Sequence, residues 1–192
     1  MSAKGRFLIL RRFRAGDEDL MLKVYGSCGM AKLLVPRGIL PQEGYLGYAE
    51  PFNLLKLVYR QSGDLLLLKD VVHVEFLSYL SLESYSAYLW MSSVASFVER
   101  WFLQYEQELF DMTLNYLTLR PRNSGVFLLR FKLEFLKRMG LYKEEVFEDG
   151  LRKIVRGVIG EENPNRLERL RISKEAFSKL EEAIEAYLSA SL

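Results

Sequence analysis

LMLKVYGSCGMAKLLV, residues 20–35, predicts a β-hairpin, and the first part of the fold is built around it. The run from Leu20 to Tyr25 has the two-residue period of a half-buried strand. Gly26-Ser27-Cys28-Gly29 is a short connection, and its glycines can adopt the positive φ angles of a tight turn. Met30 to Val35 then returns as the partner strand.

Other β-type segments flank this hairpin. Residues 7–13 predict a strand before it, and residues 36–44, with two prolines and two glycines, predict a loop after it. Residues 45–60 predict an extended stretch interrupted at Pro51, and residues 65–76 predict a last strand. Five or six strands within about 80 residues indicate a small closed barrel, an OB-fold or an SH3-like barrel.

From Ser81 onward the apolar period lengthens to that of α-helices. Residues 82–105 predict a long amphipathic helix. Residues 109–119 predict a second helix, which ends before Arg120-Pro121 because proline disfavours helical geometry in the residue before it. Residues 126–139 predict a central helix.

Residues 141–172 are loosely patterned, with a loop at 161–165, and Ser173 is a predicted N-cap for a last helix. The predicted fold class is therefore α+β. An N-terminal OB-fold β-barrel for nucleic-acid binding occupies residues 1–80, and an all-α helical domain occupies residues 81–192.

The charge of the chain is unevenly distributed. Residues 1–60 contain ten Lys or Arg and five Asp or Glu, whereas the remainder contains more acids than bases, and the whole chain has a formal net charge of +2. A basic segment followed by an acidic one indicates an anionic partner for the basic segment, and nucleic acid is the first candidate. A solvated basic surface without a ligand explains the same charges and stays open.

We expect the basic residues of the barrel to contact phosphates without reading base sequence. The candidate nucleic-acid-binding residues are Lys4, Arg6, Arg11, Arg12, Arg14, Lys23, Lys32, Arg37, Lys56 and Arg60. Candidates for base stacking, or else for barrel packing, are Tyr25, Tyr45, Tyr48, Phe52 and Tyr59.

The sequence contains no pattern typical of a catalytic site, and we predict that the protein is not an enzyme. The single histidine, His73, shares a strand face with Glu75 by alternation, while Val72, Val74 and Phe76 share the other. An ordinary strand histidine explains this position without chemistry. The single cysteine, Cys28, lies in a turn, so neither an internal disulfide nor a thiolate metal site is expected.

We also predict a cytoplasmic protein. The longest charge-free stretch, residues 84–98, is shorter than the roughly 20 residues that a membrane span needs. The basic residues near the start of the sequence leave no apolar segment long enough for a secretory signal.

Several motifs occur in an order and spacing that resemble the bacterial recombination mediator RecO family. The hairpin is followed by Arg37-Gly38, as in that family's two barrel strands and basic loop, and Leu46-Gly47 with Glu50-Pro51-Phe52 resembles its Leu-x-Gly-x-Leu-Gln-Pro-Phe stretch. The run Arg130 to Tyr142 is similar to its Phe-Glu-x-x-Leu-Leu-x-x-x-Gly-Tyr motif. The remaining matches are residues 66–75, 85–99 and 109–119.

The resemblance implies an OB-fold protein that binds single- and double-stranded DNA, anneals complementary strands and helps to load recombinase onto DNA coated by single-strand-binding protein. It implies RecR as a partner, and it places Arg130 and Lys132 where the acidic tail of single-strand-binding protein docks. It implies no cofactor here, because residues 143–150 lack the four cysteines of the family's zinc site. The loop after Arg37 is less basic than in the family, so an adaptor whose barrel does not bind DNA stays open as the alternative.

Overall fold

The structure, a computed structural model, describes residues 2–192. The chain forms two compact units, one that ends at Thr118 and one that spans Leu119–Leu192. The predicted domain boundary at residue 80 therefore lies inside the first unit, which contains the barrel and the helices that directly follow it.

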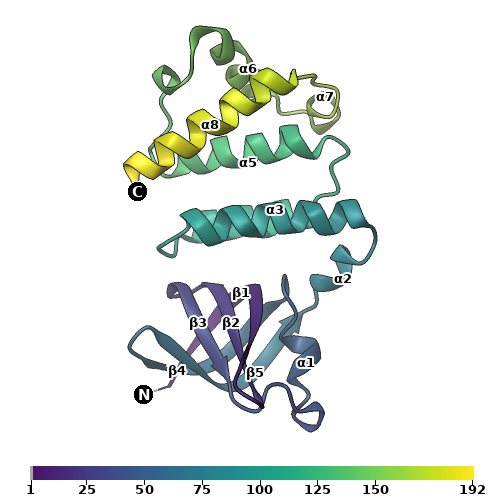
Figure 1. The fold of residues 1–192 in the computed structure, drawn as a ribbon, viewed down its shortest axis with the longest axis vertical. Helices are drawn as coiled ribbons and strands as arrows, with labels where there is room; N and C mark the ends of the chain where they lie inside the picture. The colour runs from purple at the N-terminus through teal and green to yellow at the C-terminus, as the bar shows by residue number, and fades with distance from the viewer. Residues whose placement is uncertain (1) are drawn as a thin grey trace. The chain divides into compact units, whose positions relative to one another are not determined.

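The first unit is built on a closed five-stranded barrel (Figure 1). The strand order around the barrel is β1-β2-β3-β5-β4, and every neighbouring pair is antiparallel except β3 and β5. The strands are β1 (Ser2–Ala15), β2 (Asp19–Gly26), β3 (Gly29–Val35), β4 (Leu54–Ser62) and β5 (Leu65–Glu75). This topology is the OB-fold that the sequence predicts, and the hairpin of residues 20–35 is β2–β3.

The sequence predicts an extended stretch from Tyr45 to Arg60, interrupted only at Pro51. The first part of this stretch is helical instead. A 3-10 turn, Pro41–Glu43, and a short helix, α1 (Tyr45–Tyr48), precede β4. Tyr45 packs against the apolar barrel core, and Ala49 is buried in it. The apolar residues of this stretch therefore contribute to the barrel core as a helical turn rather than as a strand.

A β-bulge in β5 changes the predicted alternation around the histidine. His73 pairs with Lys56, but the next pair on the same two strands is Val71 with Leu57, so that Val72 has no partner in the register. Val72 is half exposed, whereas Val71 and Val74 pack against the barrel core. The prediction that Val72 and Val74 share a face is therefore wrong.

Three helices complete the first unit: α2 (Ser78–Ser81), α3 (Tyr85–Trp101) and α4 (Gln107–Thr118). Ser84 caps α3 by accepting the backbone N–H of Ala87. The helix ends earlier than predicted because Phe102 leaves helical geometry, and the following segment contacts the barrel through Tyr25, whose hydroxyl donates to the Gln104 carbonyl.

The second unit is entirely helical. Its elements are α5 (Ser124–Arg138), a 3-10 turn (Glu144–Val146), α6 (Asp149–Gly160), α7 (Pro164–Leu167) and α8 (Lys174–Ser191). The Ser173 hydroxyl accepts the Ala176 N–H at the start of α8, which confirms the predicted cap. The sequence did not predict α6, although Leu151, Val155 and Val158 form its buried stripe. Within residues 2–192, no helix is both long and apolar enough to cross a membrane.

Candidate nucleic-acid interface

A row of cations crosses the outer face of β1, β2 and β3. Arg11 pairs in register with Lys23, and Lys23 pairs with Lys32. A bulge between Ile9 and Arg11 sets this register, so that Ile9 points into the core and Arg11 points outward. The neighbouring row on the same face is apolar and contains Phe13. Side chains on this face lie where OB-folds hold oligonucleotides.

Two of these three cations are paired with one carboxylate of α3. Glu99 Oε2 lies 2.6 Å from Arg11 Nε, and Glu99 Oε1 lies 3.0 Å from Lys23 Nζ. The Glu99 side chain is only 15% exposed, so it is held against the barrel. Lys32 has no ion pair with any residue that the structure describes. The face is therefore much less positive than the sequence suggests.

The other candidate cations between residues 11 and 37 are Arg12, Arg14 and Arg37. Within residues 2–192, two of them form ion pairs and one does not. Arg12 Nη1 lies 2.5 Å from Glu50 Oε1, and Arg37 Nη1 lies 3.1 Å from Glu43 Oε1. Arg14 is exposed and makes no ion pair with the described residues. Of the six candidates from Arg11 to Arg37, only Arg14 and Lys32 are thus unpaired.

A second group of cations lies on the outer face of β1, β4 and β5. We call this face the β4 face, and its cations are Lys4, Arg6, Lys56 and Arg60. Because Leu55, Leu57 and Tyr59 point into the core, the intervening β4 residues point outward. Arg6 is paired in register with Lys56, which brings their side chains onto neighbouring positions of one face.

The β4 face has few acids to balance its cations. Arg6 Nη2 lies 3.8 Å from Glu75 Oε1, with both side chains about half exposed. Lys4, Lys56 and Arg60 are exposed and form no ion pair within residues 2–192, although Asp70 lies in the register row of Lys4. His73 adds a further polar side chain next to Lys56. Lys4, Lys56 and Arg60 can therefore neutralise phosphates without first breaking an internal ion pair.

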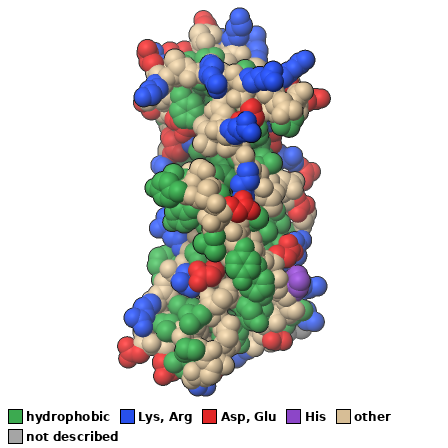
Figure 2. Space-filling model, turned by 90° about the vertical axis from the view of Figure 1, so that its right-hand side faces the viewer, with side chains coloured by type: hydrophobic (Ala, Val, Ile, Leu, Met, Phe, Trp, Pro, Cys, Tyr) green, Lys and Arg blue, Asp and Glu red, His purple; other side chains and the backbone are tan. Residues whose placement is uncertain are grey.

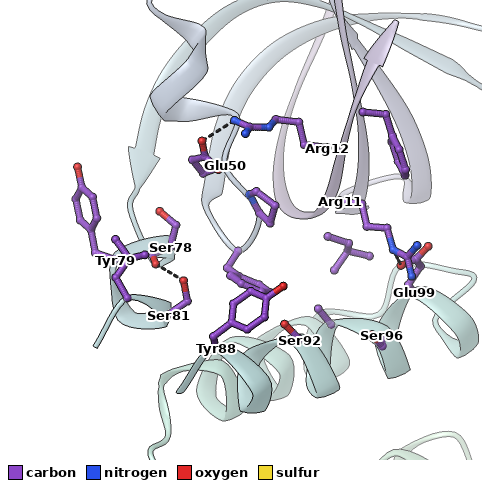
Figure 3. Close-up of a pocket in the computed structure, with 16 residues that line it drawn as sticks. Arg11, Arg12, Glu50, Ser78, Tyr79, Ser81, Tyr88, Ser92, Ser96 and Glu99 are labelled. Atoms are coloured by element: carbon purple, nitrogen blue, oxygen red, sulfur yellow. Dashed lines mark hydrogen bonds and ion pairs between the residues drawn. The ribbon is translucent and has the colours of Figure 1, made fainter. Parts of the chain in front are cut away.

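A groove of about 810 Å³ runs between the barrel and the helices that follow it in the first unit (Figure 3). Arg11 and Arg12 enter it from β1, each with its carboxylate partner, and Ser92 and Ser96 line it from α3. Tyr79 and Tyr88 contribute exposed rings at its rim. Aromatic rings beside cations can hold single-stranded bases by stacking, so the groove is the part of the surface suited to a base.

The sequence did not identify these groove aromatics, and most of its own stacking candidates belong to the core. Tyr25, Phe52 and Tyr59 are buried, and Tyr45 packs against the barrel interior. Only Tyr48 is exposed, with its ring 6.0 Å from that of Phe76. Strand aromatics between lysines are thus packing residues here. Tyr79 and Tyr88 lie outside the barrel strands, where no charge pattern marked them.

The two residues expected to hold an acidic peptide, Arg130 and Lys132, are engaged inside the second unit. Arg130 Nε donates to Glu134 Oε1 at 2.8 Å, and its Nη1 donates to the Glu161 carbonyl at 2.5 Å. Lys132 is buried and pairs with Glu181 of α8. Arg130 is partly exposed, whereas a peptide could reach the Lys132 ammonium only after its ion pair opened.

Comparison with known proteins gives the chain a relative. It is 37% identical over 154 residues to an uncharacterized protein of Aquifex aeolicus (strain VF5), and the match spans 80% of this chain and 70% of that protein. No protein-family model matches the chain.

Proposed function

The chain belongs to the same family as the uncharacterized Aquifex aeolicus protein, and we propose that it is a DNA-binding recombination mediator and not an enzyme. In this proposal it acts in DNA repair and recombination after DNA damage, in the cytoplasm. It binds single- and double-stranded DNA, anneals strands and helps to load recombinase onto DNA coated by single-strand-binding protein. The RecO resemblance of the sequence supplies these functions.

The observation that carries the proposal is the β4 face of the OB-fold barrel. Lys4, Lys56 and Arg60 are exposed cations on three register rows of one sheet face, without acids bound to them among the described residues. Cations spaced along strands can follow the phosphates of a nucleic-acid backbone and release its counterions. Phosphate contacts carry no base information, so binding should be independent of sequence.

The proposed protein partners are RecR and the acidic tail of single-strand-binding protein. Of the two residues that the resemblance assigns to this tail, Arg130 is the better candidate, because its guanidinium is partly exposed while Lys132 is buried. We therefore propose Arg130 as the contact for the tail and assign Lys132 to the packing of the second unit.

Fluorescence anisotropy with a labelled, mixed-sequence single strand tests DNA binding at several salt concentrations. The K4Q/K56Q/R60Q variant removes three charges from the β4 face. The K137Q/K143Q/K153Q variant is the matched control, because it removes three charges from exposed lysines of the second unit. Loss of three phosphate contacts should lower the slope of log affinity against log salt by about 2, since each contact to a single strand contributes roughly 0.7.

The control variant should keep the affinity and the salt slope of the unmodified protein. If the unmodified protein binds no oligonucleotide even at low salt, the mediator proposal is wrong. If it binds but both variants behave alike, DNA binding does not use the β4 face.

The second candidate function is a protein adaptor whose barrel does not bind DNA, and an exposed apolar surface favours it. Phe76, Tyr79, Leu82 and Tyr85 are all exposed around α2, and the last three are between 65% and 77% exposed. Figure 2 shows hydrophobic side chains gathered over this side of the first unit. Exposed apolar patches on soluble proteins commonly bind other proteins. If the protein binds no DNA even at low salt, the adaptor function is favoured over the mediator function.

A further inference from the structure

The second unit contains a polar pocket with four arginines around it, which we call the arginine pocket. It has a volume of about 630 Å³. Its cations come from two separate segments, the connection before α5 and the connection between α7 and α8. The lining residues are Arg120, Arg122, Asn123, Asn165, Glu168, Arg169 and Arg171. Figure 2 shows Lys and Arg side chains gathered over the second unit on the side that it presents.

Hydrogen bonds fix the two segments against each other. The Glu168 carboxylate accepts the backbone N–H groups of Arg122 at 2.9 Å and Asn123 at 2.7 Å. The Asn123 side chain donates to the Leu170 carbonyl at 2.9 Å. The backbone that presents the arginines is therefore held in place before any ligand binds, and a preorganised site loses less entropy on binding.

The charge of the pocket is unbalanced. Glu168 is its only acid, and both carboxylate oxygens are occupied by N–H groups at the start of α5. Arg122, Arg169 and Arg171 are exposed, and the structure gives their guanidinium groups no carboxylate partner within residues 2–192. Clustered like charges repel each other, so an anion bound among them would relieve that repulsion.

The lining of the pocket selects among anions. Guanidinium groups present planar pairs of N–H donors that match the oxygens of phosphates and carboxylates. An acidic peptide would also bring apolar side chains, and the arginine pocket has no apolar side chain in its lining to receive them. A phosphodiester backbone needs only charge and hydrogen-bond donors, which arginine and asparagine supply.

We propose that the arginine pocket is a phosphate-binding site for a nucleic-acid strand, separate from the β4 face. The inference rests on the proposed function only in that the ligand is DNA. The arginine pocket and the β4 face share no residue, helix or strand, and they belong to different compact units. A chain with cations in both units can hold phosphates at two places, which is what bringing two strands together requires.

The test compares single-strand binding by the full chain with that of R122Q/R169Q/R171Q. Removing three arginines should weaken binding by roughly tenfold or more at moderate salt and lower the salt slope by about 2. The K137Q/K143Q/K153Q variant, with three charges removed elsewhere in the same unit, should match the unmodified protein. The R122K/R169K/R171K variant keeps the charge and should keep most of the slope, which excludes loss of folding as the cause.

The outcomes separate this inference from the proposed function. Unchanged affinity and salt slope in R122Q/R169Q/R171Q, with weaker binding by K4Q/K56Q/R60Q, would overturn the inference that the arginine pocket binds DNA. The same result would support the proposed role of the β4 face. The reverse pattern would support the pocket and overturn the role of the β4 face. Binding of inorganic phosphate or of an acidic peptide to the pocket, with no effect of the variant on oligonucleotide binding, would also overturn the inference.

Discussion

Glu99 of α3 lies against Arg11 of β1, with 2.6 Å between the carboxylate Oε2 and the guanidinium Nε, and its other oxygen holds Lys23 of β2. One helix carboxylate thus occupies two cations on the barrel face that OB-folds use for oligonucleotides. A phosphate that binds there has to displace Glu99 or to bind beside it. DNA affinity of this face is therefore set by the helix as well as by the strands.

Glu99→Gln should increase DNA affinity. The substitution frees Arg11 and Lys23, and two added phosphate contacts should raise the salt slope for a single strand by about 1.4. The same change should lower the free energy of unfolding by about 1–2 kcal/mol, because two ion pairs of a largely buried carboxylate are lost. Anisotropy titration and urea unfolding measure the two effects. Glu162→Gln, at an exposed position of the second unit, removes the same charge and should change neither. A variant with unchanged affinity would show that this face does not take DNA.

Substitutions in the Lys132–Glu181 pair should be unequal in their effect on stability. Glu181→Ala removes one partner of the buried Lys132 ammonium and should lower the free energy of unfolding by about 1–3 kcal/mol. Lys132→Met should cost less, because the Glu181 side chain is 25% exposed and can be hydrated. Urea unfolding of the two variants gives the order. Lys132→Met should leave the binding of an acidic peptide unchanged, and a large loss of peptide affinity would return Lys132 to a binding role.

Asn53→Ala should destabilise the first unit by about 2–3 kcal/mol. Asn53 is completely buried, its amide donates to the carbonyls of Gly47 and Tyr48, and its Oδ1 accepts the Ser78 N–H. The substitution leaves these groups without partners, and unsatisfied buried polar groups are costly. Asn115→Ala, at an exposed helical position, is the control for the loss of an amide. Equal unfolding free energies for the two variants would contradict the prediction.

The barrel could be predicted because its strands obey a local pattern. Leu20 to Tyr25 and Met30 to Val35 alternate around a glycine turn, and this information lies within a few residues. Tyr45 and Val72 could not be placed in the same way. Tyr45 belongs to a helical turn whose position depends on the barrel core, and Val72 lies at a bulge that only the pairing with β4 reveals.

The residue types of the candidate interface could be predicted from the sequence. Which of its cations form ion pairs could not. The sequence identifies Arg11, Arg12 and Lys23 as cations of the barrel, and all three lie on β1 or β2. It contains no signal that Glu50 and Glu99, distant along the chain, would pair with them. The charge pattern did not indicate Arg122, Arg169 and Arg171 either, because residues 61–192 together contain more acids than bases, although the second unit alone contains more bases than acids.

The Tyr25 hydroxyl should make the protein sensitive to alkali. Burial, chiefly, raises the pKa of Tyr25 to about 12 from its ordinary value of 10, while its hydroxyl donates to the Gln104 carbonyl. A pKa that is higher in the folded state favours folding while the group is protonated. The contribution is therefore complete below pH 10 and is lost as the pH rises from 10 towards about 12.

Tyr25→Phe isolates this effect. Below pH 10 the variant should be less stable by about 1 kcal/mol, since the hydrogen bond to Gln104 is lost and the carbonyl stays partly buried. Between pH 10 and pH 12 the unmodified protein should lose on the order of 2 kcal/mol that the variant keeps, so the two unfolding curves should approach or cross. Urea unfolding at a series of pH values measures the difference, and Tyr85→Phe at an exposed position controls for tyrosine content. Parallel pH profiles for Tyr25→Phe and the unmodified protein would show that the Tyr25 phenol titrates equally in the folded and unfolded states.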